Sequence, residues 1–478
     1  MAMGAYLSRA SMQRNYGQDT PFDDNLNFFT SLGPREDGGF KPQAVAPGSA
    51  VSTTPMWQAG GPVLGTYTLP PGYAMFNGTS MSSPQGAGAG ALLISAARAS
   101  NKQAAPAQLR KALNSTARYL DPARFGAFAQ GNGLINVPAA WELLKTNLAT
   151  VDIKATVPVN TILSGFLATP GVGTGIFDRE GVTAGVAYTR TYTLTRTNGG
   201  SNPITYNLSW VGNDGTFSTP ASISLAKNVA TPLLVNINPA AGSHSAILNF
   251  DDPSSPGIEF QTMNTVIAPY ELNAGNGFSQ AVSGSVGRGQ QLHYFFRVPT
   301  GTPAFKVDLS TTASTTPGTG QIRFLRWHPW GLGVDSNAVS NCYVPDQAGC
   351  TTGTGTSRTV TNPQAGVWEV TVDARRTSDT DFTPFTLTGT ILGASVSPNP
   401  DVIPSATVGV PVARSYTMTN LFGAFTGRAV GTALGSARLG PFTIAHLEQQ
   451  QYQTTIPAGT TSFRATIGSP SDPAADLD

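Results

Sequence analysis

The chain has 478 residues, enough for about three domains with separate hydrophobic cores. Its formal net charge is +1 and 12% of its residues are charged, about half the usual share, which leaves no electrostatic basis for binding nucleic acid. No run of about eighteen apolar residues predicts a membrane span, and no signal peptide opens the sequence.

Residues 1–148 have the pattern of an α/β domain. Residues 1–6 predict the interior of a strand in a parallel sheet. Three helices are expected near residues 88–98, 107–116 and 138–145. The small side chains of the first helix predict close packing against its neighbours.

From about residue 149 the hydrophobic pattern alternates with a period of two, which predicts strands and no helix. The 53 glycines and 36 prolines are typical of short strands joined by turns, because a hydrophobic content of 40% argues against disorder. All-β domains of the sandwich or jelly-roll kind are therefore expected. They are a β-sandwich over residues 149–270, a jelly-roll over 271–392 and a second β-sandwich over 393–478.

An internal repeat indicates that the two sandwiches are copies of one module. Residues 185–195 and 409–419 carry Gly-Val followed, at identical spacing, by Arg-Thr-Tyr-Thr-Leu-Thr and Arg-Ser-Tyr-Thr-Met-Thr. The alternative is that any two Thr-rich strands look alike. The second copy stops at Asp478 without a closing strand, so we expect it to be truncated.

The two cysteines, Cys342 and Cys350, lie close together in a stretch rich in Gly, Thr and Pro. A metal site would need further ligands, and none lies nearby in the sequence. We therefore predict a disulfide that closes one loop, rather than a redox pair or a metal site. No metal or other cofactor is predicted.

Residues 77–84, Asn-Gly-Thr-Ser-Met-Ser-Ser-Pro, have the features that a nucleophilic serine needs. Such a serine requires an exposed hydroxyl, backbone N–H groups facing the developing oxyanion, and a nearby base. Gly78 leaves room for a substrate backbone beside Ser80. Ser83 is expected to cap a helix whose first residue is Pro84, which would place Ser80 at a positive helix end. A capped, non-catalytic helix start is the alternative.

The same residues resemble the nucleophile signature of the subtilisin family of serine peptidases, Gly-Thr-Ser-Met-x-x-Pro. Residues 31–48 resemble the segment that approaches this signature in the family, and residues 130–137 resemble the end of its catalytic domain. The resemblance implies that Ser80 is the catalytic serine. It also implies that the Ser80 backbone N–H belongs to the oxyanion hole, with support from the Thr79 hydroxyl.

A narrower resemblance, to the tripeptidyl-peptidase II group of subtilases, rests on residues 4–8, 77–84, 128–131 and 175–180. It implies the C-terminal part of an α/β subtilisin-like catalytic domain, followed by β-rich domains. The module over residues 271–392 resembles the pre-peptidase C-terminal type of domain found behind secreted bacterial peptidases.

The residues that would complete a subtilisin triad do not precede Ser80. No histidine lies ahead of it, and Lys41 is predicted to be a surface residue rather than a base for the serine. The four histidines follow it in the β-rich part and are predicted to be structural: His244, His293, His328 and His446. The acidic residues ahead of it are predicted to be solvated: Asp19, Asp23, Asp24, Glu36 and Asp37.

The resemblance places the histidine, the aspartate, the oxyanion asparagine and a signal peptide upstream of Met1. We therefore expect a fragment of a secreted subtilase that acts on peptide or protein substrates and is inactive alone. Its β domains are candidates for contact with a cell surface or a polysaccharide, and nucleic acid and membrane spans are not expected. The alternative is a non-catalytic, secreted binding or adhesion protein with a relic serine motif. An Asp-bearing strand and a His-bearing helix encoded upstream in frame would favour the peptidase.

Overall fold

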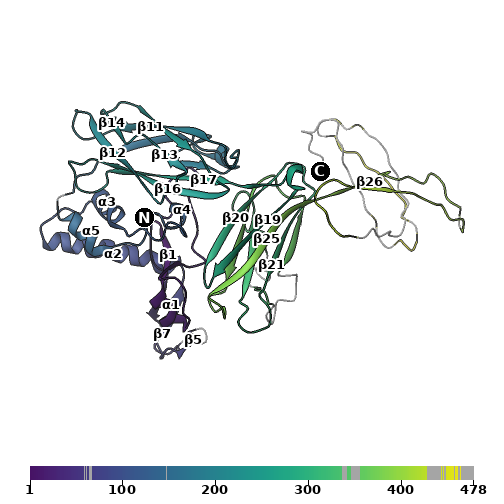
Figure 1. Cartoon of the computed structure of the whole chain (residues 1–478), viewed down its shortest axis with the longest axis horizontal. Coiled ribbons are helices and arrows are strands. Elements are labelled where there is room, and N and C mark those ends of the chain that lie inside the picture. Colours follow the sequence, from purple (N-terminus) through teal and green to yellow (C-terminus); the bar gives the residue numbers. More distant parts are fainter. Residues whose placement is uncertain are drawn as a thin grey trace. The chain divides into compact units, whose positions relative to one another are not determined.

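A computed structural model shows the fold of the chain (Figure 1). It describes residues 1–58, 60, 62–63, 67–146, 148–335, 342–345, 356–407, 409–427, 443, 445, 448–456, 458–460 and 463. The chain divides into two compact units, Met1–Phe425 and Thr426–Asp478. Among the described residues of the second unit, none belongs to a helix or strand.

The first part of the chain builds a small mixed sheet around strand β1 (Met3–Ser8). This strand pairs in parallel with β3 (Ala44–Pro47) and antiparallel with β2 (Asp24–Leu26). The predicted strand near residue 1 is therefore present, and its predicted parallel pairing is made with β3. Helix α1 (Arg9–Tyr16) follows directly, because the Ser8 side chain accepts a hydrogen bond from the backbone of the first turn.

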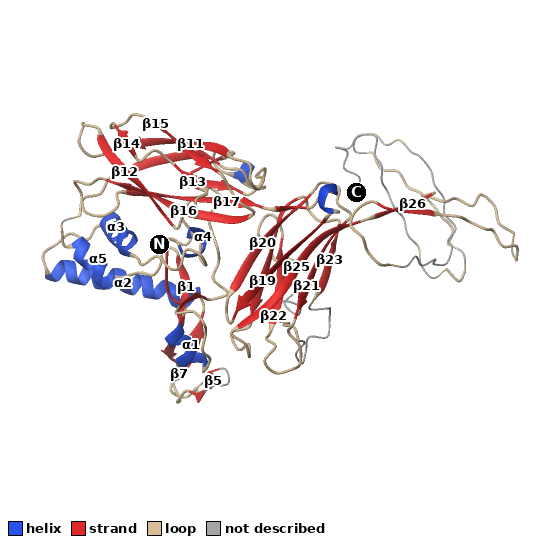
Figure 2. Cartoon of the chain, in the orientation of Figure 1, coloured by secondary structure: helices blue, strands red, loops and turns tan. Residues whose placement is uncertain are grey.

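Helices cluster in this first part of the chain, and strands dominate the rest (Figure 2). The helices that follow α1 are α2 (Thr79–Ala99), α3 (Pro106–Thr116), α4 (Ala127–Gln130) and α5 (Val137–Leu144). The three predicted helices correspond to α2, α3 and α5. Small side chains on α2 pack as expected, since Ala89 and Ala97 are buried in a core shared with Leu113 and Leu144.

Two short hairpins precede α2. Strands β4 (Ser49–Thr53) and β7 (Tyr73–Asn77) pair antiparallel, with Ser49 opposite Asn77. Strands β5 (Pro62–Val63) and β6 (Tyr67–Thr68) form a second pair between them. The longer hairpin matters for function because it delivers the chain to the start of α2.

Residues 153–268 form two five-stranded sheets that share one hydrophobic core. Tyr192 and Leu194 reach this core from one sheet, and Tyr206 and Phe250 reach it from the other. The first sheet has the order β10 (Ile176–Asp178), β17 (Phe260–Ala268), β16 (Gly242–Asp251), β12 (Ile204–Val211) and β14 (Ser222–Leu225). The second has the order β13 (Phe217–Ser218), β15 (Thr231–Ile237), β11 (Tyr188–Arg196), β8 (Ile153–Pro158) and β9 (Val172–Gly173). One 3₁₀ turn, η1, covers Ser164–Phe166.

Residues 270–392 form two four-stranded sheets around a second core that includes Phe296, Phe305 and Trp368. One sheet has the order β18 (Tyr270–Glu271), β20 (Gln291–Val298), β24 (Gly366–Ala374) and β22 (Ile322–Trp327). The other has the order β19 (Ser279–Gly287), β25 (Phe382–Leu392), β21 (Ala304–Thr311) and β23 (Ser357–Thr361). A 3₁₀ turn, η2, covers Ala274–Asn276.

Beyond this sandwich, β26 (Ala394–Ser397) and β27 (Thr417–Asn420) form a two-stranded sheet with exposed side chains. Much of the predicted second copy of the first sandwich lies outside the described residues, so the repeat stays a prediction. Cys350 also lies outside them, and the predicted disulfide with Cys342 stays a prediction. None of the helices in the described residues has the length and hydropathy needed to cross a membrane.

Candidate active site

Ser80 lies in the first turn of α2, directly after the strand β7, and its side chain is exposed. The turn between them is held by Gly78, whose N–H donates to the Gly48 carbonyl at 2.9 Å. The Ser80 hydroxyl has no hydrogen-bond partner among the described residues. A serine at this position is thus presented to solvent by a strand–turn–helix unit, as a nucleophile requires.

The predicted helix start was wrong, because α2 begins at Thr79 rather than at Pro84, and Ser83 does not cap it. Proline is tolerated inside the helix because its missing N–H removes one bond, to the carbonyl of Ser80 four residues earlier. Ser80 and Pro84 are both exposed, so water can hydrate that carbonyl. The correction moves Ser80 into the helix itself.

The new helix start leaves the Ser80 N–H free for a ligand. The first four N–H groups of a helix lack partners within the helix, and their dipoles favour negative charge. The Met81 N–H donates to the Gly78 carbonyl at 3.0 Å, whereas the Ser80 N–H has no backbone acceptor among the described residues. This free donor beside the exposed hydroxyl is suited to a developing oxyanion.

Gly78 keeps the space around this donor open. A Cβ added to Gly78 would lie 3.6 Å from the Ser80 nitrogen and 3.9 Å from the Ser80 Cβ. A larger side chain would therefore cover the N–H and crowd the hydroxyl. Thr79 is half-buried at the first helical position, and its predicted support of the oxyanion stays a prediction.

Sequence reasoning missed Tyr16, whose buried hydroxyl holds the strands that precede the Ser80 turn. Its side chain is 2% exposed, and its hydroxyl lies 2.9 Å from the Ser49 Oγ and donates to the Asn77 Oδ1. It therefore ties both strands of the hairpin together at the residue that precedes Gly78. No local signal marks this role, because the two partners lie 33 and 61 residues away in the sequence.

None of the described histidines contacts Ser80. The His293 Nδ1 lies 2.8 Å from the Glu369 carboxylate. His328 stacks on Trp330 with ring centroids 4.7 Å apart. Lys41 is exposed and His446 lies outside the described residues.

His244 is held most completely of the described histidines. Its Nδ1 lies 2.6 Å from the Asp214 carboxylate, and its Nε2 lies 2.9 Å from the Ala240 carbonyl. Burial alone would lower the pKa of His244, but these two contacts outweigh burial and leave the pKa raised. Burial alone would raise the pKa of the Asp214 carboxyl. The hydrogen bond with His244 outweighs burial and lowers this pKa to about 2. Both nitrogens being occupied, this imidazole has a structural role.

The prediction that the acidic residues ahead of Ser80 are solvated loop residues was wrong for Asp24, which lies in β2 and has a mostly covered side chain. The Arg118 guanidinium binds Asp24 through two hydrogen bonds of 2.6 and 2.8 Å, and the Tyr6 hydroxyl donates to the same carboxylate at 2.5 Å. The Arg118 hydrogen bonds hold the pKa of Asp24 below its ordinary value. The other two pairs are Arg9 with Asp19 and Arg35 with Asp37. Arg118 lies 94 residues from Asp24 in the sequence, so sequence proximity could not show that pair.

Comparison with known proteins matches two parts of the chain to family models. Residues 4–133 match the subtilase family, and residues 153–268 match the Ig-like domain in actinomycete serine proteases. The first match contains the Ser80 turn and the strands that hold it.

Relatives of known identity agree with these matches. Pyrolysin of Pyrococcus furiosus is 27% identical over an alignment that covers 100% of this chain and 32% of that protein. Tripeptidyl-peptidase 2 of Drosophila melanogaster is 35% identical over 155 residues, covering 32% of this chain and 10% of that protein. The chain therefore spans less than a third of these relatives.

A crystal structure of tripeptidyl peptidase 2 has a similar fold. It superposes with a TM-score of 0.55 at 18% sequence identity and covers 84% of this chain and 30% of that chain. At this identity the likeness concerns the fold. The sequence matches carry the family assignment.

Proposed function

Residues 4–133 belong to the subtilase family and the chain resembles tripeptidyl-peptidase 2, and from this premise we propose that Ser80 is the nucleophile of a serine peptidase. The observation that carries the proposal is the exposed Ser80 hydroxyl beside its own unpaired N–H, at the start of α2. An exposed hydroxyl beside an unpaired N–H can meet the carbonyl carbon and the developing oxyanion of one substrate.

In the proposed reaction the Ser80 Oγ attacks the carbonyl carbon of a peptide bond while an imidazole removes its proton. The carbonyl oxygen becomes an oxyanion that accepts a hydrogen bond from the Ser80 N–H, with support from the Thr79 hydroxyl. The imidazole then protonates the leaving amine, and water hydrolyses the acyl-enzyme. We propose that the imidazole and the carboxylate that orients it come from the part of the peptidase that this chain does not span in its relatives.

We also propose the organisation that the sequence predicts. Residues 1–148 would be the C-terminal part of the peptidase domain, and residues 149–270, 271–392 and 393–478 would be β domains, the second of the pre-peptidase C-terminal kind. The likeness of residues 153–268 to a domain of actinomycete serine proteases supports a secreted protein. The β domains would act as spacers or as contacts to substrate or cell surface.

The test uses the complete peptidase and a fluorogenic peptide substrate. We expect Ser80→Ala to lower kcat/KM about 10⁴-fold or more, because the nucleophile is lost while folding is untouched. Ser83→Ala is the matched control, since Ser83 is an exposed serine of the same helix. Unchanged turnover in Ser80→Ala would instead favour a binding protein with a relic motif. The chain alone is expected to show negligible turnover.

A further inference from the structure

A cavity of about 460 Å³ lies within the unit Met1–Phe425. It lies between residues 1–148, called the α/β segment below, and the sandwich of residues 270–392. Its volume is in the range of small-ligand sites, roughly 300–1,000 Å³. One wall is apolar and comes from the α/β segment, with Leu7, Met12 and Phe28. The opposite wall comes from the sandwich and is rich in arginine.

The positive charge of this second wall is only partly neutralised. Asp373 is buried and already receives hydrogen bonds from the Arg323 Nε at 2.7 Å and the Tyr343 hydroxyl at 2.9 Å. Arg375 and Arg376 also line the cavity, and neither forms an ion pair with a described carboxylate. Their guanidinium groups lie over aromatic rings, and an arginine so placed keeps N–H donors for an anion.

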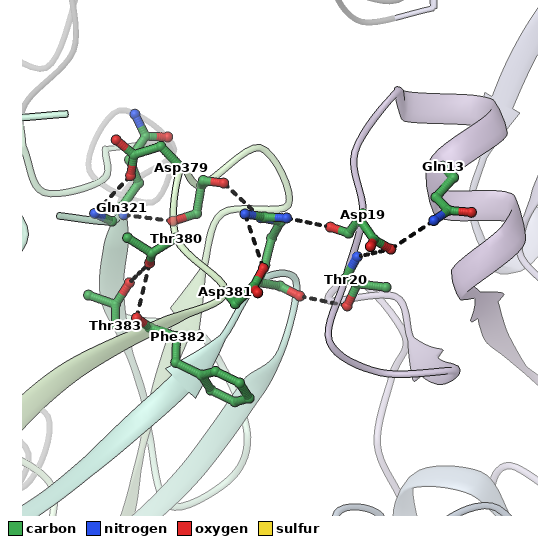
Figure 3. A network of polar contacts seen from close by, with 12 residues as sticks. Gln13, Asp19, Thr20, Gln321, Asp379, Thr380, Asp381, Phe382 and Thr383 are labelled. Carbon is green, nitrogen blue, oxygen red and sulfur yellow. Dashed lines mark hydrogen bonds and ion pairs between the residues drawn. The ribbon is translucent and has the colours of Figure 1, made fainter. Parts of the chain in front are cut away.

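The two walls are fixed to each other beside the cavity. The Arg288 guanidinium donates to the Asp19 carbonyl at 2.6 Å and to the Ser378 carbonyl at 2.7 Å. The Asn25 Nδ2 donates to the carbonyl of Gly289, itself a lining residue, at 3.0 Å. Figure 3 shows the polar contacts around Asp19 and Asp381, with Asp19 on the segment beside α1 and Asp381 on the sandwich loop. The cavity is therefore held open by polar contacts that do not use its arginines.

We propose that this cavity binds the C-terminal carboxylate of a peptide whose last side chain is apolar. Arg375 and Arg376 would donate to the carboxylate, and Leu7, Met12 and Phe28 would contact the side chain. A guanidinium pairs with a carboxylate through two parallel hydrogen bonds, which makes arginine the fitting residue for this group. Several kinds of apolar molecule carry a carboxylate. We choose a peptide because the proposed function is that of a peptidase, and this choice therefore rests on the proposed function.

The test measures binding of N-acetyl-Ala-Leu to the full chain by isothermal titration calorimetry. We expect saturable binding of the free acid, at least tenfold weaker binding of the C-terminal amide, and weaker binding of octanoate than of the peptide acid. Equal binding of acid and amide, or no binding at millimolar concentration, would overturn the proposal. Tighter binding of octanoate would overturn the choice of a peptide.

Variants test the named donors. Arg375→Gln and Arg376→Gln are each expected to weaken binding of the acid at least tenfold and to leave binding of the amide unchanged. Arg98→Gln, in an exposed arginine of α2, is the control. The melting temperature identifies a variant that fails to fold, and wild-type affinity in both folded arginine variants would overturn the proposal.

Ser80→Ala separates this inference from the proposed function. Ser80 does not line the cavity, so the variant is expected to bind the peptide acid with wild-type affinity. Carboxylate-dependent binding in a protein whose activity does not depend on Ser80 would contradict the proposed function alone. Ser80-dependent activity without binding would contradict this inference alone.

Discussion

The start of α2 and the sandwich of residues 153–268 differ in whether their polar side chains are buried and hydrogen-bonded. In the sandwich, the Arg196 side chain is 0% exposed and donates to four backbone carbonyls at distances between 2.7 and 3.1 Å. At the start of α2, Ser80 is exposed and its hydroxyl has no partner among the described residues. A polar group with every partner in place serves the fold, whereas an exposed one without partners is available for chemistry.

The largest effect on stability is expected from breaking the Arg196 network. Arg196→Met should lower the free energy of unfolding by about 2–3 kcal/mol, because the buried Leu225 carbonyl and three carbonyls of the loop 198–202 lose a charged donor. Lys154→Met is the control, since Lys154 is exposed on the neighbouring strand β8 and should change stability by about 0.5 kcal/mol or less. Urea denaturation measures both, and similar losses would show that the buried network contributes little.

At the start of α2 the comparison predicts a loss of activity, accompanied by some loss of stability because Gly78 has a φ of 158°, which side chains rarely adopt. Gly78→Val in the complete peptidase should lower kcat about 10²- to 10³-fold, because the new side chain would cover the Ser80 N–H that serves the oxyanion. Steady-state kinetics with a fluorogenic peptide measures the effect. A variant with wild-type kcat would show that this N–H takes no part in the reaction.

Tyr16 shares one property with each region, since it is buried like Arg196 and supports the turn that carries Ser80. Tyr16→Phe should lower the free energy of unfolding by about 1–2 kcal/mol, because the hydroxyl contacts with Ser49 and Asn77 are lost. Hydrogen exchange at Asn77 and Gly78 should increase as well. Tyr73→Phe, at an exposed tyrosine of the same hairpin, is the control, and equal effects in both variants would contradict the anchoring role.

The smallest effect is expected from pH, through His244 and Asp214. Because the pKa of His244 is raised in the folded protein, protonated His244 stabilises the fold fully below the ordinary pKa of 6.5. This stabilisation is lost as pH rises through the higher pKa of the folded state. The lowered pKa of Asp214 makes its contribution complete above the ordinary 3.8, and it is lost as pH falls through about 2. The pair therefore stabilises most between about pH 4 and 6.5.

Because Asp214 is half-exposed, solvent screening should keep this contribution to about 0.5 kcal/mol or less. His244→Gln should flatten the decline in melting temperature between about pH 6 and 8. His328→Gln is the control, because burial lowers the pKa of His328 and its removal should therefore not flatten a decline that occurs as pH rises. A decline of the same size in His244→Gln would show that other groups cause it.

Much of this architecture follows from local sequence patterns, and what does not depends on distant contacts. The period-two alternation predicted strands such as β8 and β15, where buried and exposed residues alternate. The start of α2 was missed because Pro84 was taken as the first helical residue, whereas Gly78, with a φ of 158°, precedes the first helical residue Thr79. The Ser80 motif is contiguous and was found from sequence. The proposed carboxylate pocket joins Leu7 to Arg376, and no local pattern connects them.

The contacts between Arg288 and Asp19, and between Asn25 and Gly289, have a consequence for limited proteolysis. They link parts of the chain about 260 residues apart in the sequence, on either side of the first sandwich. A protease cut within that sandwich would sever the polypeptide but leave these contacts in place. The two cleavage products should migrate together on a native gel and separate in detergent.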